Sequence, residues 1–137
     1  MEIIISFIVG IAASVATLSG DRILRSVKQK KVYFPLQGKY TQHTLSGKRI
    51  GDFITEFKYK KKNIFDTHNG PKEKWDGRIV MSEENPGSGS GTYNYKDRDD
   101  CGIHQIQYDY EKESIFVLST NMSHGKEYKS SYVLKKI

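Results

Sequence analysis

The chain has a single cysteine, Cys101, among its 137 residues. One cysteine excludes an intramolecular disulfide framework and leaves no CxxC pair for zinc, and it is typical of a protein in a reducing compartment. The length suits one domain, so a two-domain dehydrogenase or a barrel of alternating strands and helices is excluded. Hydrophobic residues are also few, at 36% of the chain.

The motifs of covalent and metal chemistry are absent as well. The four histidines form no HxH or HExxH pair, and the CxxH spacing of Cys101 and His104 lacks two further zinc ligands. There is no GxSxG elbow, and residues 87–91 (GSGSG) lack the GK[ST] ending of a phosphate-binding loop. We therefore expect no catalytic residue, no metal and no cofactor, and we interpret the chain as a protein that is not an enzyme.

One long run without charge extends over residues 3–20. It is as long as the shortest membrane-spanning helices, about 18 residues. A cleaved signal peptide carries its basic residues ahead of the apolar run, whereas this chain has only Glu2 there. A buried core helix is a further alternative. The positive-inside rule places the basic side of the run in the cytosol, and its basic residues are Arg22, Arg25, Lys28, Lys30 and Lys31.

These features predict three parts: a transmembrane helix over residues 1–24, a basic juxtamembrane linker over 25–36, and a cytosolic domain over 37–137. The expected location is the inner (cytoplasmic) membrane, crossed once, with the C-terminal domain in the cytosol. Ser6, Gly10 and Ser14 recur at every fourth position, a spacing that lets helices approach closely in lipid. We therefore expect a homo-oligomer. The domain has no basic stripe, so duplex nucleic acid is not an expected partner.

The domain itself has the sequence pattern of an all-β fold. Short runs of strand-forming residues alternate with turn signals, and helical periodicity is absent. We expect a small antiparallel β-barrel with the sequential strand order of a lipocalin-like meander, and a two-sheet sandwich is the alternative. Residues 85–91 are expected to form a flexible loop that could cover the barrel mouth. The eight expected strands are residues 39–45, 50–59, 63–68, 74–82, 92–96, 103–110, 114–120 and 127–136.

Aromatic residues fall on several of these strands. An eight-stranded barrel can hold side chains alone or one small ligand, so the aromatic residues form either a core or a pocket. The faces of Trp and Tyr stack nucleobases, and His and Asn supply polar contacts. The pocket interpretation predicts a nucleotide-type ligand, and its candidate binding residues are Tyr40, His43, Trp75, Tyr93, Tyr95, His104, Asn121 and His124.

A membrane segment, a basic linker and a small barrel follow one another along the whole chain. In this order of parts the chain resembles the membrane-anchored β-barrel effectors of cyclic-oligonucleotide anti-phage (CBASS-type) systems, the SMODS-associated two-transmembrane β-strand-rich family. That family has two membrane helices, and one is expected here. The resemblance implies a barrel that binds a cyclic oligonucleotide, oligomerises and disrupts the membrane in anti-phage defence. A constitutive membrane-tethered interaction module and a lipocalin-like lipid binder remain as alternatives.

Overall fold

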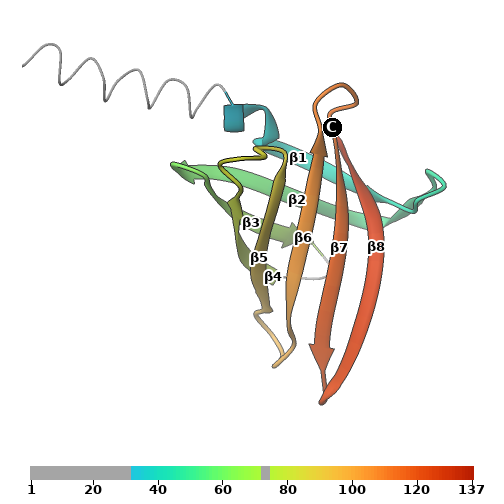
Figure 1. Cartoon of the computed structure of the whole chain (residues 1–137). Helices are drawn as coiled ribbons and strands as arrows, with labels where there is room; N and C mark the ends of the chain where they lie inside the picture. The colour runs from blue at the N-terminus through green and yellow to red at the C-terminus, as the bar shows by residue number, and fades with distance from the viewer. Residues whose placement is uncertain (1–31, 72–74) are drawn as a thin grey trace, which may run out of the picture.

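The computed structural model describes residues 32–71 and 75–137. Its strands form a closed antiparallel barrel in which each strand pairs with the next along the chain and β8 pairs with β1 (Figure 1). The expected antiparallel barrel of eight strands is confirmed, and the two-sheet alternative is wrong. The strands are β1 (Gly38–His43), β2 (Arg49–Lys61), β3 (Ile64–Gly70), β4 (Trp75–Met81), β5 (Ser88–Tyr95), β6 (Cys101–Asp109), β7 (Ser114–Ser123) and β8 (Lys126–Lys136).

Within residues 32–71 and 75–137, no helix has the length and apolar character needed to cross a membrane. The expected transmembrane helix lies outside the described residues, together with Ser6, Gly10 and Ser14. The membrane location and the helix contacts therefore stay predictions.

Along the strands, buried residues that face the interior of the barrel alternate with exposed residues on its outer surface. On β6, Gly102, His104, Ile106 and Tyr108 are buried, whereas the residues between them are exposed. Successive side chains of a strand point to opposite faces of a sheet, so one set of alternate residues lines the interior. The interior therefore receives a fixed set of side chains from every strand.

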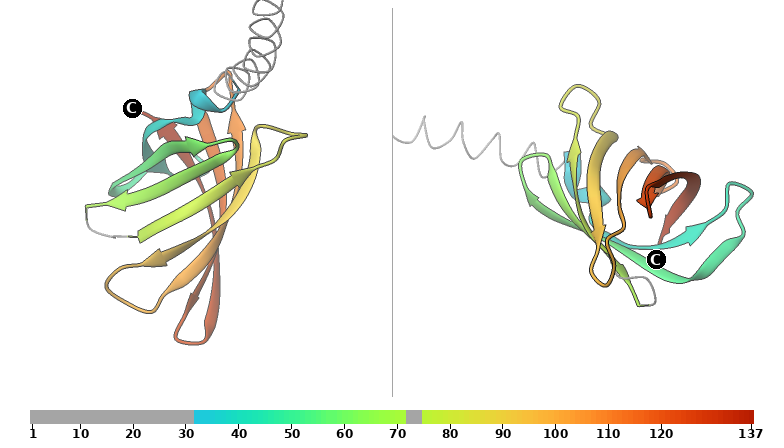
Figure 2. Two further views of the ribbon diagram at one scale, coloured as in Figure 1. Left: turned by 90° about the vertical axis from the view of Figure 1, so that its left-hand side faces the viewer. Right: turned by 90° about the horizontal axis from the view of Figure 1, so that it is seen from below.

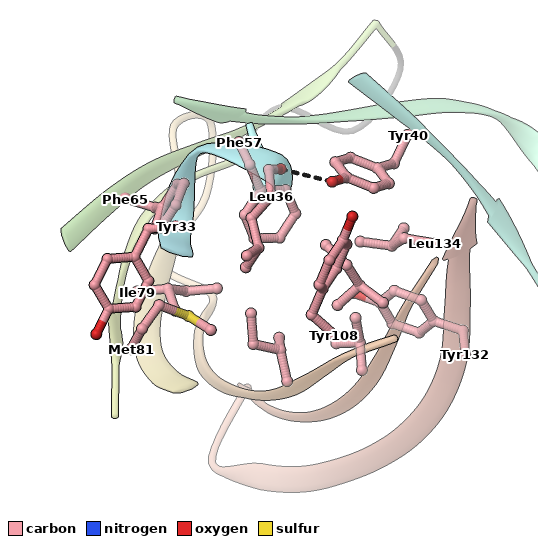
Figure 3. Packing of buried hydrophobic residues seen from close by; sticks show 13 residues of the cluster. Tyr33, Leu36, Tyr40, Phe57, Phe65, Ile79, Met81, Tyr108, Tyr132 and Leu134 are labelled. Atoms are coloured by element: carbon pink, nitrogen blue, oxygen red, sulfur yellow. Dashed lines mark hydrogen bonds between the residues drawn. The ribbon is translucent and has the colours of Figure 1, made fainter. Parts of the chain in front are cut away.

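A short 3-10 turn, η1 (Phe34–Leu36), closes one end of the barrel. Leu36 is fully buried in the hydrophobic core, with its backbone carbonyl facing Tyr40 (Figure 3). The Tyr108 hydroxyl donates to the Pro35 carbonyl at 3.3 Å. Tyr33 is buried as well. Tyr33 and Leu36, expected at the end of the linker, thus belong to the hydrophobic core, whereas Phe34 between them is exposed.

The opposite end of the barrel carries the β5–β6 connection and the β7–β8 hairpin (Figure 2). His124 and Gly125 form the turn of this hairpin with φ values of 51° and 75°, as two-residue turns with two positive φ angles require. Because the turn is so short, β7 and β8 extend beyond the ends expected from the sequence. We call this end the open end, and the end at η1 the closed end.

The expectation of a flexible loop over residues 85–91 is wrong for residues 88–91, whereas residues 85–87 do lie in the connection between β4 and β5. β5 begins at Ser88, so most of the GSGSG run is paired strand. The segment also lies at the closed end, where the backbone N–H of Tyr108 donates to the Gly87 carbonyl at 2.7 Å. It therefore covers no mouth at the open end.

The attachment of η1 to the barrel can be tested at Tyr40. Its hydroxyl donates a hydrogen bond of 2.6 Å to the Leu36 carbonyl, and the Tyr40 side chain is fully buried. We expect Tyr40→Phe to lower the free energy of unfolding by about 1–2 kcal/mol, because the buried carbonyl loses its donor. Urea denaturation measures this loss. Tyr128→Phe, at an exposed tyrosine, is the control, and an equal loss there would contradict the assignment.

Candidate functional site

The barrel interior becomes polar and aromatic towards the open end. A cavity of about 180 Å³ remains there between β1 and strands β4 to β8. It exceeds the roughly 150 Å³ that hold a benzene ring and is smaller than the roughly 300 Å³ of a small drug site. The space thus matches one planar ring. Its lining residues are Gln42, Trp75, Tyr93, Tyr95, His104, Ser119, Asn121, Tyr128, Ser130 and Tyr132.

Five of the eight candidate residues line this cavity: Trp75, Tyr93, Tyr95, His104 and Asn121. The other three lie elsewhere. Tyr40 belongs to the hydrophobic core at the closed end. The His43 ring contacts Thr41 Oγ1 at 2.8 Å and the Gly47 carbonyl at 3.3 Å, next to the β1–β2 turn. His124 is exposed in the β7–β8 turn.

Five lining residues were missing from the candidate set, and three of them share a face of β8. Tyr128, Ser130 and Tyr132 alternate along that strand, and this period of two was the signal that could have found them. Ser119 and Gln42 complete the set. Ser119 lies directly opposite His104 on β6 and Ser130 on β8. Two small hydroxyl side chains at this level leave the space that larger residues would fill.

An aromatic cluster forms one wall of the cavity. The rings of Tyr93 and His104 are stacked, with centroids 4.1 Å apart and planes inclined by 18°. Trp75 meets the His104 ring edge-on at 4.9 Å. Gly102 allows this packing, because a Cβ there would lie 2.4 Å from Cζ of Tyr93. The wall therefore offers flat surfaces on which a planar ligand can stack.

Hydrogen bonds fix the polar groups of the wall. The Tyr93 hydroxyl and Ser119 Oγ share a hydrogen bond of 3.0 Å, and the Tyr132 hydroxyl lies 3.5 Å from Nε2 of His104. Burial lowers the pKa of His104 to about 4, so its imidazole is neutral at neutral pH. A neutral imidazole has one donor and one acceptor nitrogen, so it can bind an uncharged edge.

Asn121 contributes a polar atom that the protein leaves unused. Its Oδ1 is buried and has no hydrogen-bond partner among the described residues. Buried polar groups in folded proteins are nearly always paired, with protein, water or ligand. This oxygen is enclosed on all sides, so it is an unsatisfied acceptor of the fold and not a contact that the cavity exposes to a ligand.

Positive charge lies near the cavity but outside it. Arg98, in the β5–β6 connection, places its guanidinium 4.0 Å above the ring of Tyr95. Its Nε contacts Asp100 Oδ2 at 2.9 Å. No residue that lines the cavity is an aspartate, glutamate, lysine or arginine. The site can thus stack an uncharged ring inside, and the Arg98 guanidinium beside Tyr95 is paired with the Asp100 carboxylate.

Over residues 32–71 and 75–137, no group of three potential metal ligands comes together. Comparisons of the chain with family profiles, with curated proteins and with solved structures find no match.

Proposed function

We propose that this chain is a membrane-anchored effector whose cytosolic barrel binds a small nucleotide-type signal, a cyclic oligonucleotide. Binding promotes oligomerisation, and the oligomer disrupts the membrane in anti-phage defence. The observation that carries the proposal is the uncharged cavity lined by Trp75, Tyr93 and His104. Aromatic faces of this kind stack nucleobases without strict sequence preference.

The distribution of charge fits a nucleotide. A base would enter the uncharged cavity, whereas its phosphate would stay near the rim, close to Arg98. Guanidinium groups suit phosphate because their donors match two phosphate oxygens at once. A phosphate deep in the cavity would be buried without a cation, which is unfavourable.

The outer surface of the barrel supports the proposed oligomerisation. Ile103, Phe116, Leu118 and Met122 are each between 39% and 51% exposed on β6 and β7. No charged residue lies within 88–94, 101–107 or 116–122, whereas the outer face of β2 to β4 carries ion pairs such as Arg78–Asp66. In a symmetric pair each surface patch meets its own copy, so an uncharged patch avoids like-charge contacts. We call this patch the β6–β7 face and place the barrel contact there.

Ligand binding promotes assembly if the ligand has a higher affinity for the assembled barrel than for the single barrel. A ligand that binds the assembled barrel more tightly than the single one shifts the population towards the assembly. Assembly would gather the expected membrane helices through Ser6, Gly10 and Ser14. The mechanism needs no covalent step, which agrees with the expectation that the chain is not an enzyme.

The filled closed end favours this proposal over a lipid binder. Leu36, Tyr40 and Phe57 occupy the apolar half of the interior, and each is at most 2% exposed. The remaining cavity is aromatic and polar, so it offers an acyl chain no long apolar channel.

The test is a thermal unfolding experiment on the full chain in detergent with a panel of cyclic di- and oligonucleotides. At 100 times its dissociation constant, a ligand stabilises the native state by about 2.7 kcal/mol, which is several degrees for a domain of this size. Ser130→Leu, which fills the cavity, should abolish the shift. Ser46→Leu, at an exposed serine of the β1–β2 turn that lies outside both the cavity lining and the β6–β7 face, should retain it. If no member of the panel gives a shift, the constitutive tethered module is favoured instead.

A variant on the β6–β7 face tests the proposed contact between barrels. We expect Leu118→Lys to weaken ligand-dependent association by at least about tenfold, because the ammonium group would lose water without a partner. Light scattering of the protein in detergent measures the oligomer size. Val80→Lys is the matched control, since Val80 is similarly exposed but lies on β4. Equal weakening by both variants would contradict the placement of the contact.

A further inference from the structure

We infer that the closed end of the barrel rests on a lipid surface, with Phe34 and Tyr110 inserted into the interfacial layer of the membrane. This inference rests on the membrane anchor of the proposed function and adds the orientation of the barrel. It assigns a partner to a surface that belongs neither to the cavity nor to the β6–β7 face.

Large apolar side chains are exposed where the described chain enters the barrel. Phe34 is 54% exposed, Tyr110 is 47% exposed, and Val32 is exposed as well. The Tyr110 hydroxyl donates to the Val32 carbonyl at 3.3 Å, so the β6–β7 connection lies beside the start of the described chain. Phe34 follows two residues later, at the first position of η1. We call Val32, Phe34 and Tyr110 the closed-end patch.

The barrel holds Phe34 on the outside. Tyr33 and Leu36, on either side of it, are fixed inward because both are buried in the hydrophobic core. Between them, the Pro35 carbonyl accepts a hydrogen bond of 2.7 Å from Nζ of Lys136. The Phe34 ring therefore cannot turn into the core without displacing these contacts. Exposed apolar side chains that lie together mark an interaction surface.

The amino-acid sequence places a membrane next to this patch. The uncharged run of residues 3–20 is the predicted membrane-spanning segment, and only residues 21–31 separate it from Val32. A chain of this length reaches at most about 40 Å when fully extended, so the closed end is the part of the barrel tethered nearest to the bilayer. Tyr is enriched at membrane–water interfaces, and Phe lines the apolar face of segments that lie in this layer. A lipid surface therefore fits the closed-end patch.

The charges at the closed end allow this contact. Lys61 and Lys62, between β2 and β3, balance Glu83 and Glu84, between β4 and β5, and residues 111–113 of the β6–β7 turn carry both signs. The barrel thus presents no strong field of one sign to the lipid headgroups. The apolar patch, and not a basic surface, makes the contact, so neutral lipid should be sufficient.

The orientation is consistent with the use of the other two surfaces. With the closed end on the membrane, the open end faces the cytosol, where a soluble signal can reach the cavity. Every anchored copy then stands the same way up. The β6–β7 faces of two copies lie at the same height and can meet about an axis along the membrane normal.

The experiment measures the quenching of tryptophan fluorescence by brominated lipids. The chain has one tryptophan, Trp75, which is buried in the barrel. Full-length Phe34→Trp and the wild type are each reconstituted into phosphatidylcholine vesicles with and without bromine on the acyl chains. We expect the brominated lipid to quench most of the fluorescence that Phe34→Trp adds, because an interfacial ring contacts the acyl chains. The fluorescence of the wild type should be unaffected.

A variant at the other end of the barrel is the matched control. Met122 is also exposed and lies near the end of β7, next to the β7–β8 hairpin. The fluorescence that Met122→Trp adds should survive in brominated vesicles. Tyr110→Trp is a second probe of the patch if Phe34→Trp fails to fold, and it should be quenched.

The other outcomes overturn the inference. Equal quenching of Met122→Trp and Phe34→Trp would contradict the orientation, and no quenching of either patch variant would contradict the lipid contact. A blue-shifted emission of Phe34→Trp without quenching would show that protein covers the patch instead of lipid.

Flotation with the vesicles after an alkaline wash separates this inference from the proposed function. If the protein floats and the patch variants are not quenched, the membrane anchor stands and only the inference falls. If the protein does not float, the anchor and the inference fall together.

Discussion

Gly91→Ala is expected to lower the free energy of unfolding by about 3 kcal/mol or more, the upper end of the cost of overpacking. A Cβ at this position would lie 1.7 Å from the carbonyl oxygen of Arg78 and 2.7 Å from Cα of Ile79. Both are backbone atoms of β4, so neither can rotate away. The two paired strands would have to separate, and the cavity wall that they carry at Trp75 and Tyr93 would move with them.

Ser90→Ala is the matched control for this prediction. Ser90 precedes Gly91 on the same strand and is exposed, so its replacement should change the free energy of unfolding by less than about 0.5 kcal/mol. Urea denaturation followed by far-ultraviolet circular dichroism compares the two variants. A Gly91→Ala protein as stable as the wild type would contradict the close approach of β4 and β5.

Gly91 also shows why part of the fold could not be predicted. A run such as GSGSG has the composition of a flexible linker, and nothing local distinguishes it from a strand. The need for glycine comes from Arg78 and Ile79, which are distant in the sequence and meet Gly91 only after the barrel has closed. Composition therefore predicted a loop where contact between strands requires the absence of a side chain.

The eight strands were predictable because alternation is a local property. Trp75, Ile79 and Met81 share one face of β4, and all three are buried. The same pattern placed Tyr93 and Tyr95 on one face of β5, and both line the cavity. Wherever a strand has one buried face, its sequence repeats with a period of two.

Alternation does not tell which end of the barrel a buried residue faces. Tyr40 and Gln42 both point inward from β1, yet Tyr40 packs in the hydrophobic core and Gln42 lines the cavity. The difference arises because η1 fills the closed end, and the contact of Leu36 with the barrel depends on the complete fold. From the sequence, the aromatic residues could form either a core or a pocket. In the structure some of them form the core and others form the cavity wall.

We expect the protein to lose about 3 kcal/mol of stability as the pH falls from about 6.5 to about 4, because of His104. Burial lowers the pKa of its imidazole from 6.5 to about 4. Below pH 6.5 the unfolded chain binds a proton that the folded protein does not, so protons favour unfolding. The difference of about 2.5 pKa units corresponds to about 3 kcal/mol, fully lost only below pH 4.

A variant that cannot titrate separates His104 from the other groups. His104→Gln should show a much flatter stability profile between pH 7 and pH 4.5 in urea denaturation. Asp76, whose hydrogen bond from His68 lowers its pKa below 3.8, loses its contribution only at still lower pH. His124→Asn, in the exposed β7–β8 turn and outside the ion pairs described above, is the control and should keep the slope between pH 7 and pH 4.5. A pH-dependent slope that survives at His104→Gln would contradict the burial of a neutral imidazole.

Because His104 stays neutral near pH 7, the cavity wall carries no charge at this pH, as the binding of an uncharged base requires.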